Sequence, residues 1–125
     1  MKVLVDTSIW IRFLSNRGSH GRDLDALLGR DEVVGHELVF GELLIGDGRG
    51  RKKLLEAYAE MEQARLVAHD EVVAFVRDRR LYGRGIGWID AHLLAAAIVG
   101  SYRLWTADPR LGGIAKDLSI AFNTR

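Results

Sequence analysis

Short apolar runs alternate with longer amphipathic stretches along the chain. The apolar runs, typical of strands buried in a sheet, predict strands at residues 2–5, 33–34, 65–68, 103–106 and 120–122. Apolar residues at helical spacing predict helices at residues 7–14, 22–28, 37–45, 52–64, 70–82, 88–99 and 109–118. Glycine-rich breaks at 46–50 and 83–87 separate some of these elements. The overall pattern is one of strands alternating with helices.

This alternation predicts an α/β fold. Successive parallel strands are joined by right-handed crossovers, which place helices on both faces of a sheet. We therefore expect a three-layer α/β/α arrangement around a central, mostly parallel sheet of about four to five strands. With 125 residues and neither a repeat nor a linker, the chain has the size of a single domain covering residues 1–125.

The composition excludes several classes of protein. The chain is 48% hydrophobic and 28% charged, as in soluble globular proteins. Its longest clean apolar run, residues 93–99, is far shorter than the roughly 18 residues of a membrane span. We therefore expect a cytoplasmic protein with no membrane association. The absence of cysteine excludes disulfides, thiolate metal ligands and cysteine nucleophiles.

The charge is nearly balanced, at +1 from 18 basic and 17 acidic residues. If several of the acids gather in one site, the remaining surface is basic. Basic residues concentrate in two stretches, 49–53 and 77–84. Each stretch could be a solvated helix face or a surface that contacts phosphate groups, and the sequence of each stretch alone is compatible with both.

Two aspartates follow predicted strands. Asp6 ends the first strand, and Asp108 comes shortly after the strand at 103–106. In an open parallel sheet, ligands bind beyond the carboxyl ends of the strands. Each residue also has a structural explanation, because Asp6 can cap the helix that starts at Thr7, and Asp108 precedes Pro109, a favoured first helical residue.

Two further acids lie within predicted helices. Asp90 falls in a first helical turn, where the helix dipole favours a carboxylate, but Leu93 and Leu94 share its face, so we expect it to point toward the packed side. Glu42 is surrounded by apolar residues at helical spacing, and neither a cap nor a dipole accounts for it. A buried unpaired carboxylate costs several kcal/mol and needs a cation or a proton. The alternative is a surface glutamate that reaches solvent.

A shared cation explains all four acids together. Oxygen ligands without cysteine suit a hard ion such as Mg²⁺ or Mn²⁺. Such an ion activates water for attack on a phosphodiester and stabilises the leaving oxygen. The sequence thus favours metal-assisted phosphoryl chemistry at Asp6, Glu42, Asp90 and Asp108.

Four segments resemble one family in order and spacing. The stretch 3–11 (VLVDTSIWI) is similar to the opening of PIN-domain toxins of the VapC family, and the likeness continues through 41–43 (GEL), 88–97 (WIDAHLLAAA) and 104–108 (LWTAD). Each motif is weak alone, but together they span almost the whole chain.

The resemblance implies a PIN fold, a Mg²⁺ or Mn²⁺ site and endoribonuclease activity on tRNA or another structured RNA. It also implies a homodimer, and a cognate VapB-type antitoxin that covers the acidic groove. The four acids match the family's acidic positions, of which that of Asp108 varies most among relatives. Ser8 and Thr106 match small hydroxyl positions that orient ligands or water around the site. RNA phosphates are then the expected partners of Arg49, Arg51 and Arg84.

The histidines, the tryptophans and the glycine-rich loop provide weaker evidence for other kinds of site. The histidines are poorly placed for a metal-free ribonuclease: His20 and His36 flank loops, His69 precedes a helix, and His92 turns away from Asp90. The tryptophans are expected to pack in the core or a dimer interface rather than stack on bases; they are Trp10, Trp88 and Trp105. The loop at 83–87 lacks a nucleotide-binding fingerprint, although its position before Asp90 makes it an RNA-facing candidate.

Two functions without nuclease activity remain as alternatives. A phosphoacceptor receiver-like domain would carry an acidic pair after the first strand, whereas Asp6 is followed by Thr7 and Ser8. The other alternative is a catalytically silent module that binds RNA or protein on the same fold. The set of four acids argues against the silent module.

Overall fold

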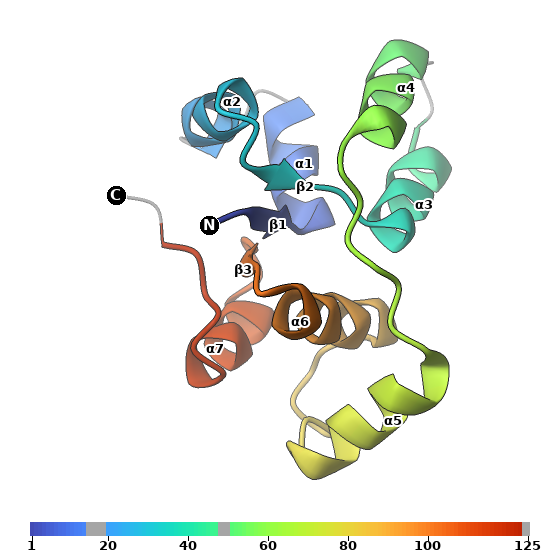
Figure 1. The fold of residues 1–125 in the computed structure, drawn as a ribbon, viewed down its shortest axis with the longest axis vertical. Coiled ribbons are helices and arrows are strands. Elements are labelled where there is room, and N and C mark those ends of the chain that lie inside the picture. The colour runs from blue at the N-terminus through green and yellow to red at the C-terminus, as the bar shows by residue number, and fades with distance from the viewer. Residues whose placement is uncertain (15–19, 48–50, 124–125) are drawn as a thin grey trace.

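A small parallel sheet lies at the centre of the molecule (Figure 1). The structure is a computed structural model that describes residues 1–14, 20–47 and 51–123. The strands are β1 (Val3–Val5), β2 (Val33–Val34) and β3 (Arg103–Trp105), in the order β2-β1-β3. Val3 of the central strand pairs with Val33 on one side and Arg103 on the other, both in parallel. The predicted α/β class is confirmed.

The edges of this sheet are weaker than the sequence suggested. Within the described residues the sheet has three strands rather than four to five. The predicted strand at 65–68 is wrong, because the chain pairs earlier, through a single bridge between Gly35 and Gln63. The predicted strand at 120–122 is reduced to one bridge between Leu104 and Ala121.

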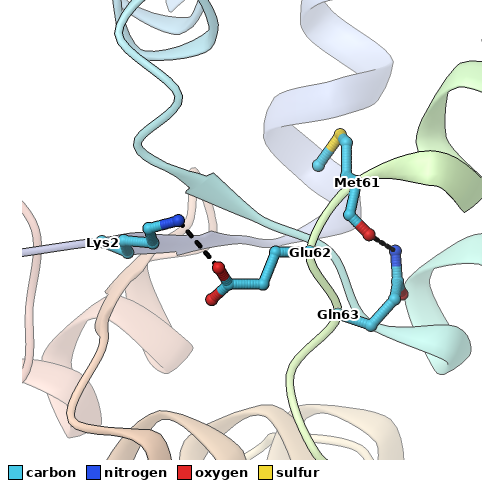
Figure 2. A network of polar contacts seen from close by, with 4 residues as sticks. All are labelled: Lys2, Met61, Glu62 and Gln63. Atoms are coloured by element: carbon cyan, nitrogen blue, oxygen red, sulfur yellow. Dashed lines mark hydrogen bonds and ion pairs between the residues drawn. The ribbon is translucent and has the colours of Figure 1, made fainter.

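The segment after the fourth helix is held against the β2 edge by polar contacts (Figure 2). Lys2 Nζ forms an ion pair with Glu62 Oε1 at 2.8 Å, and Gln63 Nε2 donates to the Met61 carbonyl at 3.2 Å. The backbone N–H of Gly35 donates to the Glu62 carbonyl at 2.8 Å. An exposed ion pair contributes little to stability, so the backbone bonds are the main link along this edge.

Helices surround the sheet, with α1 and α2 above it and α6 and α7 below it in Figure 1. They are α1 (Thr7–Leu14), α2 (His20–Gly29), α3 (Glu37–Ile45), α4 (Lys52–Glu60), α5 (His69–Asp78), α6 (Trp88–Gly100) and α7 (Pro109–Asp117). No helix in the described ranges is long and apolar enough to cross a membrane.

Helix α5 ends earlier than its hydrophobic pattern predicted. Arg80 adopts a left-handed conformation with φ of 53°, and the N–H of the next residue, Leu81, donates to the Val76 carbonyl at 2.9 Å. This is the hydrogen bond of a Schellman cap, which closes a helix and tucks in the following apolar residue. Leu81 is accordingly buried, although it lies outside the helix.

β1 and α6 each contribute a fully buried stretch to the core. All residues of β1 are buried, and so are residues 91–97 of α6. The small side chains of the alanines in α6 let this helix approach the sheet closely, as dense packing requires. Because the strands are parallel, their carboxyl ends share one edge, so Asp6 after β1 and Thr106 after β3 emerge side by side.

Candidate active site

Asp6 lies at the carboxyl edge of the sheet, between β1 and α1. The residue is 6% exposed. Its Oδ2 accepts hydrogen bonds from Ser8 Oγ at 2.8 Å and from Thr106 Oγ1 at 2.7 Å. Each hydroxyl has one hydrogen to donate, and both are directed at this oxygen. The two hydroxyl oxygens lie 3.3 Å apart, but they do not hydrogen-bond to each other, because neither has a second hydrogen to donate.

The same hydroxyls bind the backbone that follows β3. Ser8 Oγ accepts the Ala107 N–H at 3.0 Å, and Thr106 Oγ1 accepts the Asp108 N–H at 3.0 Å. Each hydroxyl thus connects the Asp6 carboxylate to the loop that carries Asp108. The network joins residues about a hundred positions apart in sequence, as the separation of Asp6 and Thr106 shows.

Asp108 caps α7, as one of the alternatives from the sequence predicted. Its Oδ1 accepts the Arg110 N–H at 2.8 Å, and Pro109 occupies the first turn. The residue is half-buried. A capping bond uses one carboxylate oxygen and leaves the other available.

Asp90 makes a different capping contact, from the third position of α6 back to the cap residue. Its Oδ2 accepts the Gly87 N–H at 3.0 Å. Burial raises the pKa of Asp90; the Gly87 hydrogen bond opposes this, and the nearby charges of Asp6, Asp108 and Glu42 raise it further. These charges act on Asp90 because the four acids, drawn from separate elements, lie in one region of the molecule.

Glu42 differs from the expectation of an acid buried in an apolar stripe. It is exposed on α3, as the alternative of a surface glutamate predicted. Its Oε1 instead accepts the Thr7 hydroxyl at 2.6 Å. Thr7 directly follows Asp6, so this bond keeps Glu42 beside the other acids. The sequence reading missed Thr7, and its only signal was its place next to Asp6.

The four carboxylates share one pattern of hydrogen bonding. In each, the protein binds a single oxygen, and the second oxygen has no hydrogen-bond partner among the described residues; the free atoms are Asp6 Oδ1, Glu42 Oε2, Asp90 Oδ1 and Asp108 Oδ2. None of these free atoms is among the fully buried unsatisfied polar atoms of the described chain. They are therefore open to water or to a cation.

The donor set fits a hard divalent ion, but the described carboxylates do not form a ready-made cage. No three acids or histidines among the described residues lie close enough to hold a metal together. Mg²⁺ usually keeps several waters and takes only one or two protein carboxylates. One free carboxylate oxygen, with further acids nearby, therefore fits the coordination that this ion prefers.

His36 has a structural role that its position in the sequence did not reveal. His36 is fully buried and caps α3, with Nδ1 accepting the Leu38 N–H at 3.0 Å. Its own backbone N–H donates to the Tyr58 hydroxyl at 2.8 Å. Burial, with a smaller effect of His92, lowers the pKa of His36 to about 4. A ring that stays neutral and caps a helix is a poor general acid.

The arginines expected to contact RNA are spread over the surface. Arg84 forms an ion pair with Asp117, with 3.0 Å between Nη2 and Oδ2. Arg51 is exposed at the start of α4, and Arg49 lies outside the described residues. The prediction that the tryptophans pack in the core or in a dimer interface is confirmed for Trp10 and Trp105, which are buried; Trp88 is 43% exposed and lies outside the core.

Comparison with known proteins identifies the class to which this fold and this cluster of acids belong. The family model described as PIN domain matches residues 3–117. A crystal structure of PAE2754 from Pyrobaculum aerophilum superposes with a TM-score of 0.58 at 17% identity, covering 90% of this chain and 78% of that one. At that identity the likeness concerns the fold alone.

Closer relatives narrow the class. Ribonuclease VapC32 from two strains of Mycobacterium tuberculosis, CDC 1551 / Oshkosh and H37Rv, is 45% identical over 120 residues, which is 95% of this chain and 94% of the relative. The chain therefore belongs to the VapC-type toxins of the PIN-domain family.

The raised pKa of Asp90 predicts a dependence of stability on pH. A folded-state pKa above the unfolded value makes the contribution of the group full below the unfolded pKa and lost as pH rises through the folded pKa. The shift starts from an ordinary value of 3.8. In EDTA, we expect urea to unfold the protein more readily at neutral pH than at mildly acidic pH, and Asp90→Asn to reduce this difference.

The matched control is Asp25→Asn, because Asp25 is exposed on α2, away from the four acids. This variant should keep the pH profile of the wild-type protein. A profile that Asp90→Asn leaves unchanged would contradict the assignment of a strained carboxylate at this position.

Proposed function

We propose that this protein is a metal-dependent endoribonuclease, the toxin of a type II toxin-antitoxin system. The observation that carries the proposal is the set of four neighbouring carboxylates, each with one oxygen fixed by the protein and one left free. Four like charges in one place are unfavourable unless a cation compensates them. The name Ribonuclease VapC32 of the relatives at 45% identity supports RNA as the substrate.

One or two of Asp6, Asp90 and Asp108 would hold the ion through their free oxygens, and the remaining acids, with Glu42 on α3, would reach it through bound water. A bound Mg²⁺ or Mn²⁺ supplies a Lewis acid that polarises the phosphodiester and its attacking water. Ser8 and Thr106 orient Asp6, since their hydroxyls hold Oδ2 and leave Oδ1 without a hydrogen-bond partner among the described residues. Thr7 fixes Glu42 in the same way.

The partners of the toxin follow from the same site. The substrate is an RNA, either tRNA or another structured RNA, and the site of action is the cytoplasm. A VapB-type antitoxin would inhibit the enzyme by covering the acidic site, where an arginine can take the place of the cation through charge-assisted hydrogen bonds. The active form is a homodimer.

Removal of a metal ligand should abolish cleavage. In Asp6→Asn and Asp90→Asn we expect the rate of cleavage of total RNA with Mn²⁺ to fall by at least about a hundredfold, and EDTA should stop the wild-type protein. Asp25→Asn is the control and should cleave normally. Cleavage that survives EDTA and leaves a 2′,3′-cyclic phosphate would overturn the metal mechanism.

The hydroxyl of Thr106 should matter for the metal rather than for the fold alone. Thr106→Val keeps the shape but removes both the donor to Asp6 and the acceptor of the Asp108 N–H. We expect Mn²⁺ affinity, measured by calorimetric titration, to fall by about ten- to a hundredfold. Thr106→Ser should restore it. If Thr106→Val bound Mn²⁺ as tightly as the wild-type protein, the orienting role of the Thr106 hydroxyl would be refuted.

The antitoxin should be the product of the adjacent gene. Co-expression should give a stable complex by size-exclusion chromatography, and purified complex should not cleave RNA until the partner is removed. If the product of the neighbouring gene left the cleavage rate unchanged, the assignment to a toxin-antitoxin system would be contradicted, whereas the nuclease activity would not.

A further inference from the structure

A small apolar pocket lies beside the acidic site, between the end of α5 and the first turn of α6. Its volume is about 130 Å³, and its lining includes Leu81, Tyr82, Gly83, Ile86 and Trp88. Sites for drug-sized ligands and cofactors usually occupy roughly 300–1,000 Å³. The pocket is therefore too small for a cofactor and suits a single planar ring system.

Two aromatic rings line this pocket and remain in contact with solvent. Tyr82 is 63% exposed and Trp88 is 43% exposed, whereas Trp10 and Trp105 are buried. Single exposed apolar residues are common on protein surfaces, but here two exposed rings line one small pocket. Both rings present large apolar surfaces that a flat ligand can cover.

The ring of Trp88 is held in place by its neighbours. It lies 5.3 Å from the ring of His69 and 5.2 Å, edge to face, from the ring of the buried His92. A ring that is fixed before binding loses little conformational freedom when a ligand stacks on it. Trp88 thus has the features of a stacking platform, since it is rigid and exposed.

The chain around the pocket is strongly basic. Between residues 77 and 87 there are four arginines and one acid, Asp78. The side chain of Arg110 also comes close, because a Cβ atom at Gly85 would lie 2.8 Å from its Cδ. Arg84 is paired with Asp117, and Arg79 lines a different pocket at the C-terminal end of α6. The apolar lining with its two exposed rings therefore complements the flat ring of a ligand.

The pocket adjoins the acidic site through the backbone. Gly87 lines the pocket and donates its N–H to Asp90 Oδ2. Trp88 lies two positions before Asp90 in the first turn of α6. A ligand whose ring enters the pocket therefore has its attached phosphate chain close to the carboxylates.

We propose that this pocket holds an unpaired nucleobase of the RNA strand, stacked on Trp88 and flanked by Tyr82. The inference rests on the proposed function, because it assigns a contact to the same substrate. Stacking on a mainly apolar surface reads the flat face of a base rather than its hydrogen-bonding edge. The pocket selects single-stranded RNA and tolerates different bases.

Binding measured without cleavage tests this inference. The probe is a labelled single-stranded RNA of about ten nucleotides, compared in EDTA with an abasic ribose-phosphate strand of equal length. Trp88→Ala should weaken binding of the base-containing strand by about five- to a hundredfold and leave the abasic strand unchanged. Tyr82→Ala should act in the same direction, and Trp88→Phe should retain most of the affinity.

The matched control is Leu66→Ala, because Leu66 is 42% exposed, close to the exposure of Trp88, and does not line the pocket. It should change neither affinity. Circular dichroism checks the fold, and truncation of the exposed Tyr82 provides a second test if Trp88→Ala is unstable.

Three results would overturn the proposal. In the first, the wild-type protein binds both strands equally; in the second, Tyr82→Ala and folded Trp88→Ala keep full affinity. In the third, these variants change only the oligomeric state in sedimentation velocity, which would mean that a second copy covers the pocket. Binding is measured in EDTA so that metal-dependent cleavage does not interfere. If the protein bound the base-containing strand but never cleaved RNA with Mn²⁺, the proposed function would be refuted and the inference about the pocket would still hold.

Discussion

Asp6 is a largely buried residue, and an ionised group in that position must be compensated by hydrogen bonds or by charge. Two hydroxyls provide part of the compensation, one from the first turn of α1 and one from the end of β3. These hydroxyls in turn bind the backbone before α7. The start of α1, the end of β3 and the approach to α7 are therefore positioned by one oxygen atom, so that the fold and the site cannot form independently.

The hydrophobic pattern of the sequence predicted much of the fold, because the central elements are buried on all sides. In the sequence, β1 is an uninterrupted apolar run and α6 is nearly all apolar; all of β1 and residues 91–97 of α6 are buried. The edges were not readable, since pairing there rests on single bridges such as Gly35 with Gln63. One bridge leaves no alternating pattern in the sequence. The end of α5 was missed because Leu81 continues the apolar pattern past the left-handed turn at Arg80.

The candidate site shows a different limit of sequence reasoning. Residue types predicted which acids to examine, and the structure places them in one region, but the pattern around Glu42 suggested a buried residue. Helix α3 carries apolar residues on more than one face, and Leu44 and Ile45 are also exposed, so periodicity could not tell the covered face from the open one. The capping and metal-binding interpretations of Asp108 also proved compatible. A cap occupies one carboxylate oxygen, and a cation needs only the other.

The distribution of charge explains how an acidic site can serve a polyanionic substrate. The chain is nearly neutral as a whole, yet its acids gather where cleavage would occur, and the segment around the adjoining pocket is rich in arginine. At a distance, basic surface attracts phosphates, an effect that salt screens over about 10 Å. Within that range the carboxylates would repel the strand until a divalent cation compensated their charge. In the proposed mechanism the cation would therefore serve the approach of a phosphate as well as the chemistry, which would link RNA placement to metal loading.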